Sequence, residues 1–187
     1  MNTKSKIIIP MMLLSFISAC SQNVQEKELS ERFFVNQLKF ELLSNLSCSL
    51  LNNDFKSMRY KVGDYDRREL KAKSDESIKD YKFKWKNLSK YSPQFSDSLK
   101  GIDSLLVDLD VDGILIREIS GECRLYIEVW SNWMTGEGQE MGYLFNPKVI
   151  YKYDPEVHSK LNRDLKTQID FTMPLSSGWY VGYSNTP

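Results

Sequence analysis

The chain has 187 residues and carries 25 lysine and arginine residues against 25 aspartate and glutamate residues, so its formal net charge is zero. A near-neutral chain gives no reason to propose a nucleic acid as a partner, and we expect none. The length suits a single domain with its own hydrophobic core.

The first segment has a positive start at residues 4–6, an apolar run over residues 7–17, and the small residues Ser18 and Ala19 directly before Cys20. This order is typical of a secretory signal peptide. The competing interpretation is a transmembrane helix, but the run is shorter than the roughly 20 residues that cross a bilayer. A plain signal peptide is a second alternative and would leave Cys20 as an ordinary thiol.

The four residues Ile17-Ser18-Ala19-Cys20 resemble a bacterial lipobox. The resemblance implies that residues 1–19 are removed as a lipoprotein signal peptide and that Cys20 is lipidated. Ser21 follows the cysteine in place of aspartate, which in the enterobacterial sorting scheme implies the outer membrane, with the domain facing the periplasm or the cell surface. Residues 20–25 would then be a short tether and residues 26–187 one globular domain.

Two further cysteines, Cys48 and Cys123, remain after Cys20. In an oxidising, exported compartment such a pair is expected to form one disulfide. A metal site or a reactive thiol pair is the alternative, but the chain has no CxxC spacing to support it.

A long amphipathic helix is predicted over residues 26–51, where apolar residues recur at every fourth position. The residues predicted to form its buried face are Phe34, Leu38, Leu42, Leu46 and Leu50, with Val35 and Leu43 beside them. Residues 56–73 show no clean period. Over residues 74–90 a helical and a strand-like period compete, and Ser74 as a helix cap favours the helix. Ser92-Pro93 predicts another short helix that ends near Gly101.

The second half predicts an antiparallel meander. Residues 105–111 and 114–119 are expected to form a hairpin around Asp112-Gly113, with Val111 facing Ile114. A third strand over residues 122–130 alternates between an inner face with Cys123 and an outer face, and further strands are expected over residues 140–145 and 179–183, with a helix over residues 154–166 between them. The predicted fold class is therefore α+β, with N-terminal helices packed on an antiparallel meander, a late helix and a final strand.

Asp108, Asp110 and Asp112, followed by Gly113, match the first half of a calcium-binding loop. Position 12 of that loop, where a bidentate glutamate belongs, is Ile119, so the three aspartates are only a weak metal candidate. His158 is the only histidine and is expected to be an exposed surface residue. The motifs of common hydrolases and nucleotide-binding proteins are absent, and no cofactor is expected.

The predicted binding surface is aromatic and consists of Tyr126, Trp130, Trp133, Met134 and Glu137, on the outer face of the third strand and in the loop after it. Such residues are enriched where proteins bind one another. The alternative is that a helix covers this face and makes these residues core.

These features predict a lipid-anchored envelope protein that binds another protein, in the manner of an inhibitor or an immunity protein. The first alternative is an envelope enzyme or glycan-binding module that uses carboxylates such as Glu128, Glu137 and Glu140 beside the aromatic residues. The second is a structural lipoprotein of envelope assembly.

Overall fold

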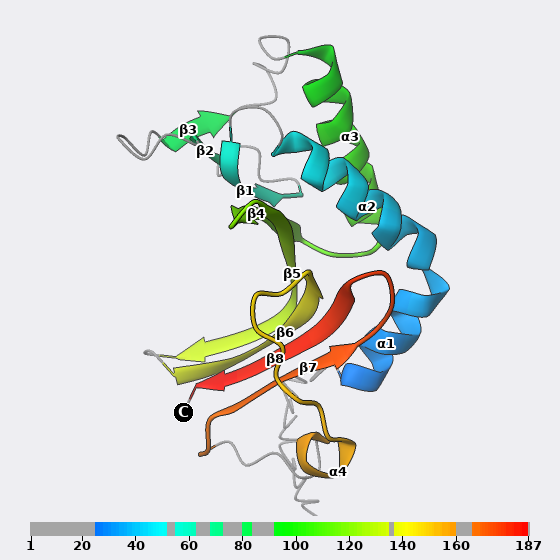
Figure 1. Ribbon diagram of the computed structural model, residues 1–187, viewed down its shortest axis with the longest axis vertical. Helices are drawn as coiled ribbons and strands as arrows, with labels where there is room; N and C mark the ends of the chain where they lie inside the picture. The colour runs from blue at the N-terminus through cyan, green and yellow to red at the C-terminus, as the bar shows by residue number, and fades with distance from the viewer. Residues whose placement is uncertain are drawn as a thin grey trace, which may run out of the picture.

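A computed structural model describes residues 25–51, 55–62, 68–72, 80–83, 92–134, 137–159 and 166–186. It confirms the α+β class: three longer helices lie on one face of an antiparallel sheet (Figure 1). The helices and strands are α1 (Glu26–Val35), α2 (Gln37–Leu50), β1 (Phe55–Lys61), β2 (Arg68–Ala72), β3 (Asp80–Phe83), α3 (Pro93–Asp108), β4 (Gly113–Ile119), β5 (Glu122–Met134), β6 (Glu137–Phe145), α4 (Pro155–His158), β7 (Ile169–Pro174) and β8 (Trp179–Thr186).

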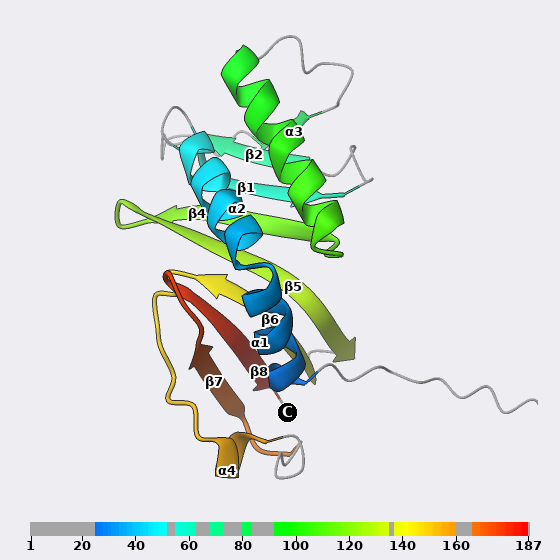
Figure 2. The ribbon, with the colours of Figure 1, turned by 90° about the vertical axis from the view of Figure 1, so that its right-hand side faces the viewer.

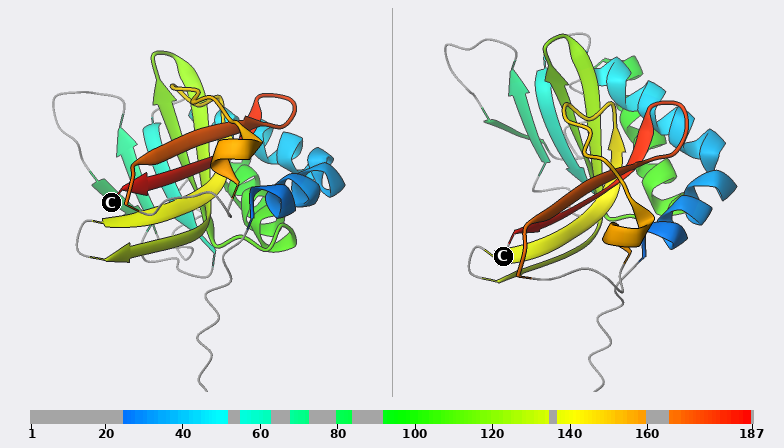
Figure 3. Two further views of the ribbon diagram at one scale, coloured as in Figure 1. Left: turned by 90° about the horizontal axis from the view of Figure 1, so that it is seen from below. Right: turned by 60° about the horizontal axis from the view of Figure 1, so that its bottom comes forward.

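The eight strands of this sheet follow the order β3-β2-β1-β4-β5-β6-β8-β7. Helices α2 and α3 cover the half of the sheet that contains β1, β2 and β4, and α1 covers the half that contains β6 and β8 (Figure 2). The opposite face carries none of these three helices (Figure 3). The strongly twisted sheet therefore has one face in the core and one face available for other contacts.

The centre of the core is aromatic. The rings of Phe33 and Phe40 lie 4.9 Å apart, and Phe40 lies 4.6 Å from Tyr143 and 5.1 Å from Trp179. All four side chains are almost fully buried. The hydroxyl of Tyr143 donates a hydrogen bond of 2.9 Å to the carbonyl of Leu29, so α1 is fixed to the sheet by a polar contact as well as by packing.

The predicted helix over residues 26–51 is divided at Asn36, which has a non-helical backbone conformation. The predicted buried face is wrong for its first half, because Phe34, Val35, Leu38 and Leu42 are exposed. The buried face consists of Leu29, Phe33, Phe40, Leu43, Ser44, Ser47 and Leu50. Two buried serines lie on this face, so a count of apolar residues favours the wrong side of the helix.

The strand predicted over residues 105–111 is also wrong, because α3 continues past Gly101 to Asp108. Ser92 caps the helix through a 3.2 Å bond from the amide of Phe95, as its sequence predicts. Leu99, Ile102, Leu105, Leu106 and Leu109 recur at helical spacing and all are buried. Because residues 105–109 belong to this stripe, Ile114 pairs with Tyr60 of β1 instead of Val111.

The polar region 56–73 contains β1 and β2, which the sequence analysis did not find. The helix favoured over residues 74–90 is wrong at residues 80–83, which form β3 and pair with β2. The other residues of that segment lie outside the described part of the chain. Tyr60 and Met58 of β1 are buried under the helices, whereas their neighbours in sequence are lysine, arginine and serine. Pairing and packing with neighbouring elements stabilise a strand of this kind, and its own sequence shows only a weak strand pattern.

The third predicted strand is confirmed as β5, with Leu125 and Ile127 buried on its inner face. It pairs with β4 through the two-residue turn Ser120-Gly121, in which both residues have positive φ values of 57° and 81°. Turns with positive φ at both positions match the twist of a hairpin, and the glycine accepts this conformation readily. The tight hairpin therefore lies one strand later than predicted.

Strands β6 and β8 confirm the two predicted last strands and extend them. Strand β7, at one edge of the sheet, was not predicted from the sequence. The late helix begins at Asp154-Pro155 as predicted, but α4 ends at His158 because Ser159 is extended. Residues 160–165 lie outside the described part of the chain.

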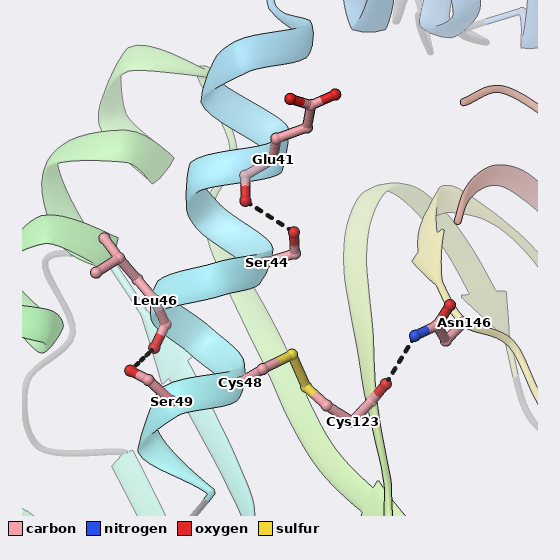
Figure 4. Close-up of a disulfide and its surroundings, with 7 residues drawn as sticks. All are labelled: Glu41, Ser44, Leu46, Cys48, Ser49, Cys123 and Asn146. Atoms are coloured by element: carbon pink, nitrogen blue, oxygen red, sulfur yellow. Dashed lines mark hydrogen bonds between the residues drawn. A yellow bond between two sulfur atoms is a disulfide. The ribbon is translucent and has the colours of Figure 1, made fainter. Parts of the chain in front are cut away.

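The predicted disulfide between Cys48 and Cys123 is confirmed, with the two Cα atoms 5.6 Å apart (Figure 4). It joins α2 to the second residue of β5. The carbonyl of Cys123 also accepts a 3.5 Å hydrogen bond from the side chain of Asn146, which follows β6. The disulfide therefore fixes the helical layer to the centre of the sheet.

Replacing Cys48 and Cys123 together by alanine should lower the free energy of unfolding by about 2–5 kcal/mol, because the bond closes a loop with a sequence separation of 75. Chemical denaturation of the mature domain would measure this loss, and reduction of the wild-type domain should reproduce it. Equal denaturation midpoints for the oxidised wild type and the double variant would contradict the prediction.

Candidate functional site

A cleft of about 460 Å³ opens on the helix-free face of the sheet, between β1, β4 and β5. Its lining includes Arg59 and Lys61 of β1, Leu115 of β4, and Tyr126, Glu128 and Trp130 of β5. These residues come from three neighbouring strands, so the sheet itself positions them. With Asp112, which also lines the cleft, the arrangement combines two cations, two carboxylates and the aromatic rings of Tyr126 and Trp130.

A second hollow of about 270 Å³ lies on the other side of Tyr126, between β6, β8 and β7. Its lining includes Glu140 and Leu144 of β6, Ser184 of β8, and Asp170 of β7. The carboxylate of Asp170 is held by Ser184, whose hydroxyl donates at 2.7 Å, and by Gln168 at 3.2 Å. Tyr126 lines both hollows and therefore forms the ridge between them.

The ring of Tyr126 lies over Gly142 of β6. A Cβ atom added at Gly142 would be 2.1 Å from the carbonyl oxygen of Ile127 and 3.1 Å from the Tyr126 ring. On the neighbouring strand, Gly182 pairs with Gly142, and a Cβ there would be 2.5 Å from the Leu144 side chain. The two glycines thus allow large side chains to lie flat on the sheet, which shapes the floor of both hollows.

Burial raises the pKa of the Tyr126 hydroxyl well above its usual range, and the negative charges of Glu140 and Glu128 raise it further. Burial also raises the pKa of Glu140. The Tyr126 hydroxyl opposes this shift, while the charges of Glu128 and Asp170 add to it. The hydroxyl faces the Glu140 carboxylate, although no hydrogen bond of regular geometry joins them in the described part of the chain. This side of the face is therefore acidic and incompletely hydrogen-bonded.

The predicted aromatic surface is only partly assembled. Tyr126 and Trp130 both line the cleft, but a bulge shifts the register between Glu128 and Trp130, so that Trp130 pairs with the core residue Met141. A shift of one residue reverses the facing of a strand, and Trp130 is half-buried against the hydrophobic core. Trp130 is thus not the free outer-face residue that the alternation predicted.

Trp133 and Met134 were expected in a loop, but β5 continues through both, and they pair with Gly138 and Glu137. The side chains of Trp133, Met134 and Glu137 lie outside the described part of the structure, and their role in binding stays a prediction.

The three aspartates of the calcium candidate lie at and beyond the end of α3. Asp108 is 3.5 Å from the ammonium of Lys39, and Asp110 is 3.9 Å from the guanidinium of Arg32. Within the described residues, no group of three or more His, Cys, Asp or Glu side chains could hold a metal ion. Two of these aspartates therefore contact basic residues of α1 and α2.

His158 is not the exposed residue that was expected. Its Nδ1 accepts a 2.8 Å hydrogen bond from the amide of Asp154, and its ring lies 5.2 Å from that of Phe171. These contacts join the last residue of α4 to Asp154, which precedes the helix, and pack α4 against β7.

A second surface, which the sequence analysis missed, lies on α1 and α2. Phe34, Val35, Leu38 and Leu42 are 49–83% exposed, and we call these four residues the apolar stripe. Exposed apolar side chains are ordinary when they are scattered, but a row at spacings of four along neighbouring helices is a patch. The signal for it was present in the sequence as two competing apolar faces.

Ionic groups of both signs surround the apolar stripe. Lys27 lies 3.8 Å from Glu31, and Lys39 pairs with Asp108. Hydrogen bonds from Gln37 and Ser177, each 2.9 Å long, lower the pKa of Glu41. The stripe is therefore an apolar centre with a polar rim of mixed charge, which is the usual composition of a protein interface.

Comparison of the chain with protein-family models, with curated proteins and with solved structures finds no match. Among the helices in the described ranges, none combines the length and the apolar character needed to cross a bilayer.

Replacing Glu140 by glutamine should leave the domain as stable as the wild type or up to about 1 kcal/mol more stable at neutral pH. The raised pKa of Glu140 means that the folded state prefers the protonated carboxyl, so stability is lost as the pH rises from the ordinary glutamate range through this raised pKa. The difference between variant and wild type should disappear near the acid end of that window.

Denaturation curves across this pH range would measure the effect, with Glu156→Gln as the control at an exposed carboxylate. A Glu140→Gln variant that is clearly less stable than the wild type at neutral pH would show that the charged form supports the fold.

Proposed function

We propose that this protein is a lipid-anchored module of the bacterial envelope that binds another protein through the apolar stripe. The single observation that supports binding is the exposure of Phe34, Val35, Leu38 and Leu42 on helices whose opposite face is fully buried. The lipid anchor at Cys20, the outer-membrane location and the periplasmic orientation rest on the lipobox resemblance.

The stripe fits a partner that offers an apolar ridge or groove. Leu38 and Leu42 lie one turn apart on α2, and Phe34 and Val35 end α1 directly before the break at Asn36, so a complementary helix or groove can cover them. The rim contains both lysine and glutamate, which suits a partner of mixed charge better than a uniformly acidic or basic surface. An inhibitor or immunity-type interaction has this form, in which one rigid surface occupies another.

A second candidate function uses the second hollow, which Glu140 and Tyr126 line. The raised pKa of Glu140, close to Glu128 and Tyr126, supports recognition or turnover of a small polar ligand such as a glycan. Retention of envelope glycans by the mature domain, and its loss in Glu140→Gln, would favour this function. Retention that survives the substitution would exclude the second hollow as its origin.

Replacing Leu38 and Leu42 together by serine should weaken binding of the protein partner at least about tenfold, because large apolar groups anchor interfaces. Folding stability should change by less than about 1 kcal/mol, since both side chains are exposed. Quantitative pull-down from envelope extracts, followed by titration of the identified partner, would measure the loss. Val157→Ser, which alters an exposed apolar residue on α4, is the matched control.

The partner must be stoichiometric and must bind the Val157→Ser control as well as the wild type. Equal affinity of the Leu38 and Leu42 double variant for such a partner would place the interface elsewhere.

Replacing Cys20 by alanine should release the protein from membranes into the soluble periplasmic fraction, because the variant has no thiol to carry the lipid. Cell fractionation with a carbonate wash and metabolic labelling with palmitate would measure both effects. Retention of the variant on washed membranes would mean that the anchor is not Cys20.

A further inference from the structure

The loop between β6 and α4 exposes a second apolar group. Val149, Ile150 and Tyr151 are 47–60% exposed, and the exposed residues Lys148 and Lys152 flank them on both sides. We call residues 148–152 the basic apolar loop. Residues 148–152 themselves contain two cations and no carboxylate, while Val149 and Tyr151 also line the second hollow, whose wall includes Glu140 and Asp170.

The backbone of the loop is fixed, so its side chains are displayed in one arrangement. The carbonyl of Tyr151 accepts hydrogen bonds from the amide of Thr172 at 3.1 Å and from its hydroxyl at 2.9 Å, both on edge strand β7. Before the loop, the amide of Asn146 donates to the carbonyl of Gly178 at 3.0 Å. A segment held at both ends in this way does not need to be ordered on binding, which favours recognition of a surface.

The loop lies close to the point where the tether joins the domain. The hydroxyl of Tyr153, one residue beyond the loop, is 3.5 Å from the carboxylate of Glu26, the first residue of α1. In Figures 1 and 2, α4 and the first turn of α1 lie at the same end of the molecule. From Gln25 back to Cys20 there are five residues, which span at most about 18 Å when fully extended.

We propose that the basic apolar loop rests on the surface of the same membrane that holds the Cys20 anchor, and this inference depends on the proposed lipidation. Aliphatic side chains can enter the boundary between headgroups and acyl chains, and tyrosine is favoured at that level. Lys148 and Lys152 can reach anionic headgroups on either side. A short tether keeps this surface within reach of the bilayer, so the contact fixes the orientation of the domain.

This orientation has a consequence for the apolar stripe. The stripe occupies α1 and α2, and its mixed rim gives no preference for anionic lipid, so it stays available for a protein while the loop faces the bilayer. The two exposed apolar surfaces are thus expected to have different occupants.

The test uses the full-length lipidated protein in vesicles of phosphatidylethanolamine and phosphatidylglycerol. Because Cys48 and Cys123 are bonded and Cys20 carries lipid, Ile150→Cys would introduce a single thiol for an environment-sensitive fluorophore. The same fluorophore at Leu38→Cys is the matched control, since Leu38 is even more exposed in the protein.

The label at position 150 should be quenched by brominated lipid and several-fold less by aqueous iodide than the label at position 38. Adding Lys148→Glu and Lys152→Glu to the Ile150→Cys variant should restore iodide quenching without releasing the protein. Equal iodide quenching at both positions in protein that floats with the vesicles would overturn the inference and leave the lipid anchor intact. Protein that does not float would overturn both proposals.

Shielding of position 150 that appears only after a periplasmic protein extract is added would also overturn the inference, because the occupant of the loop would then be a protein.

Discussion

Strand β5 is the constraint on which the rest of the structure depends. It pairs with β4 at its start and with β6 from Leu125 to Met134, so it carries the connection between the two halves of the sheet. Its second residue, Cys123, is bonded covalently to α2, and its inner residues form part of the floor on which the helices pack. Because one strand takes part in both halves, a disturbance of its register would be felt in the core, in the cleft and in the helical layer.

The shape of the helix-free face depends on this strand arrangement and on two glycines, which have no side chains. Gly142 and Gly182 lie side by side, and the Tyr126 ring occupies the space above Gly142. The ring separates a hollow with Arg59 on its wall from one with Asp170 on its wall. The same sheet therefore presents groups of both signs on one side of the Tyr126 ring and the carboxylates of Glu140 and Asp170 on the other. The exposed apolar groups lie on the helices and on the loop after β6.

The sequence could predict features that depend on a local alternation of residues, or on a side chain that has only one possible bonding partner. Strand β5 was found from its alternation, and the disulfide from the two thiols that remained. The buried face of α2 was missed because Ser44 and Ser47 lie on it, and small polar residues allow close packing without an apolar signature. The shift at Trp130 comes from a single extra residue in the ladder, which no composition rule marks. Strand β1 could not be seen because its neighbours create its environment, and those neighbours come from distant parts of the chain.

For the proposed exported protein, the separation of 75 residues between the bonded cysteines also bears on the order of events during synthesis and translocation. If the N-terminus leads the chain out of the cytoplasm, Cys48 reaches the oxidising compartment well before Cys123 and must wait for it as a free thiol. Only when β5 has also crossed can an oxidant join the helical layer to the sheet. The disulfide of an exported chain would then form only outside the cytoplasm. A chain kept in a reducing cytoplasm would lack the bond between α2 and β5.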